Sequence, residues 1–231
     1  MKINPLKITK YMNIVRAFEN TVNNDTTYDS IAQIGDMAID IMVNDNALDK
    51  IPVLGTIASI YKVTKNIQLL RLMKKVYKFI FLTKDTTLTE RIEFIKEYTE
   101  ISKEEGYEAL LAVIDKLDNI NKVDVIVNLM KAKIRGYIGI VDFIRLCNVI
   151  DRIPYPDFNE LSKYIEEYYQ AGSTDVLLSA GVLFNTTING NENKYKLNHL
   201  GENLLRYGLL VDVSVDKQTY TRLGVLDWQK L

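Results

Sequence analysis

The stretch LLSAGVLFNTTINGNENKYKLNHLGENLLRYGLL, residues 177–210, decides the fold of the C-terminal part of this chain. Residues 182–188 alternate and are rich in β-branched side chains, which predicts a strand. Asn189-Gly190-Asn191 is a strong turn signal, and residues 194–197 can return as the partner strand. Asn198 can then cap a closing helix. The order is a short helix, a hairpin and a second helix.

The flanking residues extend this pattern in both directions. Asp157-Phe158-Asn159-Glu160 can cap a helix that runs through Tyr169. Ser173 or Thr174 can cap the short helix before the hairpin, and Gly181 can end that helix in the left-handed conformation. Residues 210–223 alternate again, which predicts a second small hairpin.

The pattern of residues 157–207 resembles a winged-helix module. The residues that carry the resemblance are Leu177-Leu178-Ser179-Ala180-Gly181-Val182-Leu183, then Tyr195-Lys196-Leu197-Asn198-His199-Leu200-Gly201, then Leu204-Leu205. They look like the wing and final helix of many bacterial winged-helix proteins. The whole chain also loosely resembles uncharacterised bacterial proteins that join a helical domain to such an ending. The resemblance implies a small α+β domain, and DNA is the usual partner of that family.

The residues that would contact DNA are Thr174 and Ser179 on the helix before the wing, and Lys194 and Lys196 on the wing. That helix has no basic residue and carries Asp175. Residues 157–207 include seven acidic and four basic residues. Because affinity for DNA depends largely on neutralising phosphates, this charge argues against DNA binding. A DNA-binding regulator is therefore an alternative hypothesis, and a module for packing or protein contact is the main one.

The preceding part of the chain has helical periodicity throughout. Pro154 and Pro156 bias their neighbours away from helix, so we expect a boundary there. The sequence predicts a mainly α protein, with an all-helical domain over residues 1–153 and a winged-helix-like domain over residues 157–231.

Several helices of the first domain have clear start signals or apolar stripes. Residues 28–43 place Ile31, Ile34, Met37, Ile41 and Met42 on one stripe. Residues 87–90 and 102–105 both match the capping-box pattern that opens a helix. Residues 121–134 and 140–151 read as two further helices, separated by Gly136-Tyr137-Ile138-Gly139.

The sharpest charge pattern lies in residues 69–82. Leu69, Leu70, Met73, Val76, Tyr77 and Ile80 fall on one face of a helix, and Arg71, Lys74, Lys75 and Lys78 fall on the other. Residues 51–84 contain seven basic residues and no acidic one, whereas residues 85–118 contain ten acidic and four basic residues. The basic face can bind an acidic protein, nucleic acid or an anionic membrane. It can also simply face water, or pair with the acidic segment within the fold.

Residue types that support catalysis or metal binding are scarce. One histidine, His199, and one cysteine, Cys147, do not make the usual zinc sets. Cys147 lies in an apolar run, so we expect a buried core thiol. There is no glycine-rich phosphate loop. Tyr164, Tyr168 and Tyr169 could stack on bases, but aromatic residues at this spacing more commonly pack in a core. We expect no catalytic site, no metal and no cofactor.

The termini and hydropathy indicate a cytoplasmic protein. The N-terminus has no secretory signal pattern, and no apolar run reaches the length of a membrane-spanning helix. The formal net charge is −1. The leading hypothesis is a non-enzymatic binding or regulatory protein that acts through protein–protein contact, including self-association. The alternatives are a DNA-binding regulator and a peripheral membrane effector that uses residues 51–82.

Overall fold

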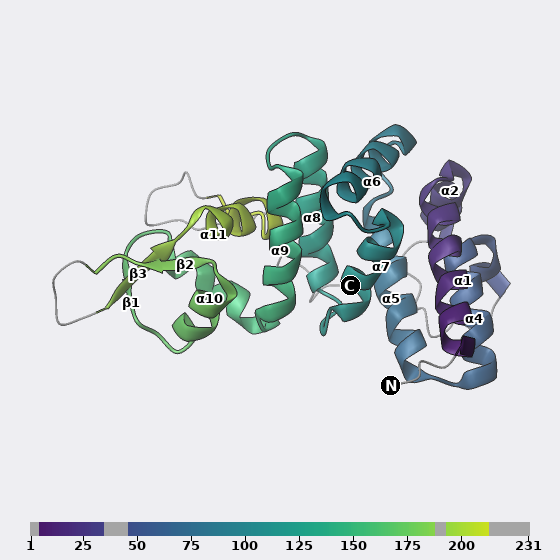
Figure 1. The fold of residues 1–231 in the computed structure, drawn as a ribbon, viewed down its shortest axis with the longest axis horizontal. Coiled ribbons are helices and arrows are strands. Elements are labelled where there is room, and N and C mark those ends of the chain that lie inside the picture. The colour runs from purple at the N-terminus through teal and green to yellow at the C-terminus, as the bar shows by residue number, and fades with distance from the viewer. Residues whose placement is uncertain (1–4, 35–45, 188–192, 213–231) are drawn as a thin grey trace. The chain divides into compact units, whose positions relative to one another are not determined.

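The computed structural model describes residues 5–34, 46–187 and 193–212 (Figure 1). It divides into two compact units, residues 1–123 and residues 124–231. The described residues are mainly α-helical with a small three-stranded antiparallel sheet near the C-terminus, which confirms the expected fold class. The boundary expected after Ile153 lies inside the second unit. A division into domains at that point stays a prediction.

The first unit is a set of helices around one apolar core. Helix α4 packs against both α1 and α5, and α7 packs against α1, α5 and α6 (Figure 1). Phe18 and Phe79 are buried in this core, and their ring centroids lie 6.0 Å apart. The elements are α1 (Pro5–Val22), α2 (Asp25–Ile34), the 3-10 helix η1 (Asn46–Lys50), α4 (Pro52–Thr64), α5 (Ile67–Leu82), α6 (Leu88–Ser102) and α7 (Gly106–Lys116).

One of the two predicted capping boxes is correct. Thr87 accepts from the main chain of Glu90 and the Glu90 side chain accepts from the main chain of Thr87, so α6 begins as expected. The second box is wrong, because α6 continues through Ser102. Helix α7 is capped instead by Glu105, whose carboxylate accepts from the amide of Glu108. The predicted helix over residues 28–43 coincides with α2 up to Ile34, and Met37, Ile41 and Met42 lie outside the described residues.

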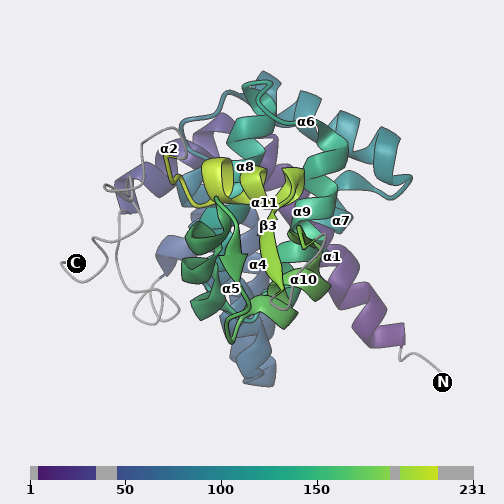
Figure 2. The same ribbon diagram turned by 90° about the vertical axis from the view of Figure 1, so that its left-hand side faces the viewer.

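The second unit begins inside α8 and ends in a small sheet. Helices α8 (Lys122–Ile134) and α9 (Ile140–Arg152) match the two helices expected there. The sheet has the order β1–β3–β2, and Figure 2 shows its strands with α11 following β3. The remaining elements are the 3-10 helix η2 (Tyr155–Tyr164), β1 (Tyr168–Tyr169), α10 (Thr174–Ala180), β2 (Leu183–Asn185), β3 (Lys194–Leu197), α11 (His199–Asn203) and the π-helical turn η3 (Leu204–Gly208).

Two local signals around the hairpin are confirmed, and the expected side-chain cap of α10 is wrong, because Ser173 precedes the helix without a capping hydrogen bond. Gly181 ends α10 with φ at 87°, in the left-handed region that glycine tolerates. Asn198 caps α11 by accepting from the amide of Gly201. The predicted helix over residues 157–169 is wrong, because the chain forms a 3-10 helix and then the strand β1. The turn at residues 189–191 and most of the hairpin at residues 210–223 lie outside the described residues.

Candidate functional site

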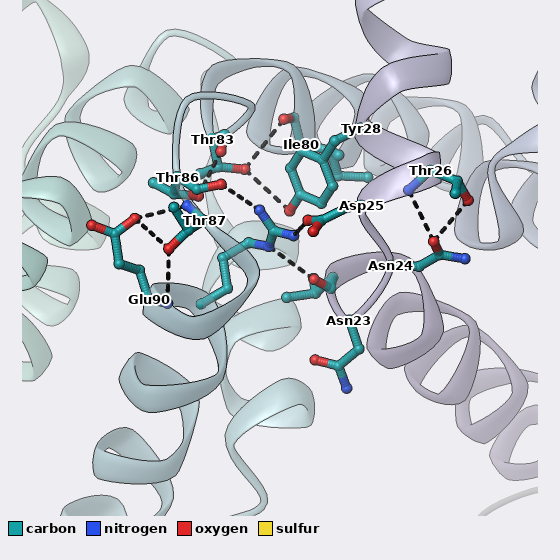
Figure 3. Close-up of polar contacts among 12 residues, drawn as sticks. Asn23, Asn24, Asp25, Thr26, Tyr28, Ile80, Thr83, Thr86, Thr87 and Glu90 are labelled. Atoms are coloured by element: carbon teal, nitrogen blue, oxygen red, sulfur yellow. Dashed lines mark hydrogen bonds and ion pairs between the residues drawn. The ribbon is translucent and has the colours of Figure 1, made fainter.

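A buried polar cluster of the first unit surrounds Arg91. Its guanidinium donates to the carbonyl oxygens of Val22 and Thr86 and pairs with the carboxylate of Asp25. The group also lies over the ring of Tyr28, with 3.9 Å between Cζ and the ring centroid. Figure 3 shows Asp25 and Tyr28, both from α2, close to Thr86, which lies in the turn between α5 and α6. Because the guanidinium is surrounded by acceptors, we interpret the cluster as a structural tie and not as a reaction site.

Tyr28 belongs to the same cluster and has a perturbed acidity. Burial raises the pKa of its phenol, and this outweighs the hydrogen bond with Thr83 and the positive charge of Arg91, which both lower it. The phenol oxygen lies 3.4 Å from the hydroxyl oxygen of Thr83. A phenol with a raised pKa stays neutral at physiological pH and cannot act as a base there.

The turn that joins α4 to α5 is built from specific local contacts. Lys65 ends α4 in the left-handed conformation with φ at 52°, and its amide donates to the carbonyl of Tyr61. Asn66 then begins α5 by accepting from the amide of Gln68 at 2.9 Å. Thr64 supports the same turn by accepting from the amide of Asn66. The two helices therefore form a tight hairpin whose end has a defined conformation.

The side chains at the end of this hairpin are exposed, although two of them are large and apolar. All of residues 62–68, hereafter the hairpin tip, are exposed. Val63 is 84% exposed and Ile67 is 53% exposed. Lys62 and Lys65 lie beside them, and Arg71 is exposed one turn further along α5. No acidic residue occurs in the sequence between Ile51 and Lys84, so α4 and α5 themselves bring no carboxylate to the apolar and positive groups of the tip.

The four basic residues predicted to form one face of α5 are not all exposed. Arg71 is exposed, and Lys74 and Lys78 are partly exposed, but Lys75 is buried. The ammonium of Lys75 donates to the carbonyl oxygens of Asp115 and Leu117 at the end of α7. Burial lowers its pKa, and the carboxylate of Asp115, 3.9 Å away, opposes that shift. Internal pairing with the acidic segment, one of the alternatives left open by the sequence, therefore occurs at Lys75.

The candidate DNA-contacting residues of the second unit are also separated. Thr174 is completely buried, and its hydroxyl oxygen lies 2.8 Å from the phenol of Tyr164 and accepts from the amide of Ala171. Ser179 is exposed, and its hydroxyl donates to the carbonyl of Val176 within α10. The side chain of Thr174 is therefore not accessible to DNA.

Lys194 and Lys196 lie on the outer face of the sheet, where sequence reasoning had not placed aromatic neighbours. Tyr169 pairs directly with Lys194, and Phe184 pairs directly with Lys196. Directly paired residues of antiparallel strands share a face, so these four side chains form one cluster, hereafter the outer sheet face. A correct prediction of the pairing register between the two strands would have placed Phe184 beside Lys196.

Cys147 and His199 are the two other side chains that the sequence analysis considered for chemistry. Cys147 is buried, as expected, and burial raises the pKa of its thiol. His199 lies within 3.2 Å of a carboxylate oxygen of Asp142 and 3.0 Å of the amide nitrogen of Asn203. Among the residues that the structure describes, no group of three or more histidine, cysteine and acidic side chains could hold a metal ion. In the same residues no helix is both long and apolar enough to cross a membrane.

No protein-family model, curated protein or solved structure matches this chain. The winged-helix resemblance therefore rests on the quoted residues alone and stays a prediction. The two candidate binding surfaces are the hairpin tip and the outer sheet face.

Proposed function

We propose that this protein is a non-enzymatic binding protein that docks on anionic membrane surfaces through the hairpin tip. The observation that carries the proposal is the exposure of Val63 and Ile67 between Lys62, Lys65 and Arg71. Apolar side chains enter the boundary between lipid headgroups and acyl chains, while lysine and arginine remain with the anionic headgroups. The tip presents both kinds of group at one end of the hairpin formed by α4 and α5.

The expected energies indicate that neither kind of group suffices alone. A basic residue near an anionic leaflet contributes about 1 kcal/mol. Full burial of a valine or isoleucine side chain contributes about 1.5–3 kcal/mol, and entry into the headgroup region achieves part of this. The sum is a few kcal/mol, which corresponds to reversible binding. Removing either the charges or the apolar groups should therefore abolish measurable association.

An acidic protein partner is the competing explanation of the same surface. It would use Lys62, Lys65 and Arg71, and it would bind without vesicles. A membrane also accounts for the apolar tip, because a valine that is 84% exposed gains from transfer out of water. The two explanations differ in whether lipid alone is bound.

The test is cosedimentation of the full chain with vesicles of phosphatidylcholine that contain about 30% phosphatidylserine, at about 50 mM and about 200 mM salt. We expect binding at the lower salt, and loss of binding in both Val63→Ser/Ile67→Ser and Lys62→Glu/Lys65→Glu. The matched control is Ile92→Ser/Lys96→Glu, an exposed pair on α6, which should bind like the unmodified chain. Failure of the unmodified chain to bind these vesicles contradicts the proposal and favours an acidic protein partner.

A further inference from the structure

The outer sheet face carries two aromatic rings where a solvated sheet ordinarily carries polar groups. The inner face packs in the core through Leu183, Tyr195 and Leu197, which are all buried. On the opposite face Tyr169 is 51% exposed and Phe184 is 45% exposed. Both rings are therefore available to a ligand.

The two lysines of β3 lie between these rings. Strand β3 is the middle strand, with β1 and Tyr169 on one side and β2 and Phe184 on the other. Lys194 and Lys196 are two residues apart, so they point to the same side of the sheet. The ammonium of Lys194 lies 5.2 Å from the centroid of the Tyr169 ring. The strands are about 4.8 Å apart and rise about 3.4 Å per residue, so the Cα atoms of Tyr169 and Phe184 are separated diagonally by roughly 12 Å, with Lys194 and Lys196 on the strand between them.

We infer that the outer sheet face binds single-stranded nucleic acid, with bases stacked on Tyr169 and Phe184 and the backbone phosphates beside Lys194 and Lys196. Aromatic platforms on a sheet that alternate with cations are the arrangement that accepts unpaired bases, because every base has a flat face to stack. The inference is independent of the hairpin tip and concerns a different unit of the protein.

A double-stranded ligand fits this surface poorly. The bases of a duplex are already stacked on one another and are not available to exposed rings. Recognition of the major groove would need a helix with basic or amide side chains. Helix α10 has none, and its Thr174 is buried. The same unit therefore favours single strands over duplex DNA.

The charge of the region sets the expected strength and salt dependence. Residues 157–207 carry seven acidic and four basic residues, so stacking has to supply much of the affinity. Two lysines on two phosphates give a slope of about −1.4 in a plot of log affinity against log salt, at about −0.7 per phosphate of a single strand. Raising the salt from about 50 mM to about 200 mM should thus weaken binding only about sevenfold.

The test is fluorescence anisotropy of the full chain with labelled oligothymidylate and oligouridylate of about 12 nucleotides, a length within the range of one small binding site. We expect binding of at least one of the two, weaker binding of a mixed-sequence duplex, and the shallow salt slope. Tyr169→Leu and Phe184→Leu should each weaken binding about tenfold, because each removes one stacked base. Tyr169→Phe keeps the ring and should retain the affinity.

Two controls separate this site from other surfaces. Tyr137→Ala removes an aromatic ring that is 60% exposed elsewhere in the same unit, and Arg71→Glu reverses a charge near the hairpin tip. Neither should change the affinity. The inference is overturned by absence of binding at about 50 mM salt, where phosphate contacts are strong. It is also overturned by equal affinity for the duplex, by Tyr169→Leu and Tyr169→Phe having the same effect, or by loss of binding in Arg71→Glu alone.

Discussion

The ammonium of Lys75 donates a hydrogen bond to the main-chain carbonyl of Leu117 at 3.0 Å. It bonds the carbonyl of Asp115 as well, so one side chain of α5 satisfies two acceptors at the end of α7. The last carbonyls of a helix have no partner within the helix, and a cation there also interacts favourably with the helix dipole. Lys75 therefore holds α5 and α7 together instead of serving an external partner.

Replacing Lys75 by methionine tests this role. The substitution keeps the apolar stem but leaves two carbonyls without their donor, so we expect the free energy of unfolding to fall by about 1–3 kcal/mol. Urea unfolding followed by circular dichroism measures the change. Arg71→Met, on the exposed side of the same helix, serves as the control and should alter stability by less than about 0.5 kcal/mol. Equal effects of the two substitutions would contradict the assignment.

The position of Lys75 could not be predicted from the periodicity of α5. Helical spacing places Arg71, Lys74, Lys75 and Lys78 on one side, and it does not reveal that α7 ends against that side. The exposure of the apolar residues in the hairpin tip could not be predicted either. Val63 and Ile67 carry no signal of exposure in the sequence, and only the turn at Lys65 and Asn66 brings them to the end of a hairpin.

The signals that did predict structure are local ones. The capping box at Thr87 and Glu90, the left-handed Gly181 and the cap at Asn198 each involve residues within one turn of a helix, so the sequence alone contains the whole interaction. Residues 157–169 were predicted wrongly because their end pairs with β3, a partner about 25 residues away in sequence. The candidate site on the outer sheet face depends on the same distant pairing.

Removal of the Arg91 side chain should be among the most destabilising single changes in the first unit. Arg91→Met leaves the carbonyls of Val22 and Thr86 without a donor, and we expect a loss of about 3 kcal/mol. Asp25→Asn should cost about 1 kcal/mol, because the amide oxygen of asparagine can still accept from the guanidinium at this largely exposed position. Urea unfolding of both variants and of the double variant checks the ranking. A larger loss for Asp25→Asn would contradict it.

The raised pKa of Tyr28 predicts a specific loss of stability in alkali. The folded state keeps the phenol proton at pH values where the unfolded chain, with a pKa of about 10, has released it. The folded state therefore binds more protons above pH 10, and its stability falls as the pH rises through the raised pKa. Tyr28→Phe removes this contribution. Urea unfolding between about pH 8 and about pH 11 should show a steeper decline for the unmodified chain than for the variant. Parallel curves would contradict the prediction.

Gly201 is required by the close approach of α11 to the start of the hairpin. A Cβ atom built on Gly201 would lie 2.3 Å from the carbonyl oxygen of Val182, which also accepts from the amide of Asn198. Because that oxygen belongs to the main chain, it cannot move aside without disturbing this hydrogen bond. We expect Gly201→Ala to lower the free energy of unfolding of the second unit by about 1–3 kcal/mol. Gly172→Ala is the matched control, since a Cβ there meets no atom within 4 Å. If thermal unfolding shows equal stability for the two variants, the close approach does not constrain the fold.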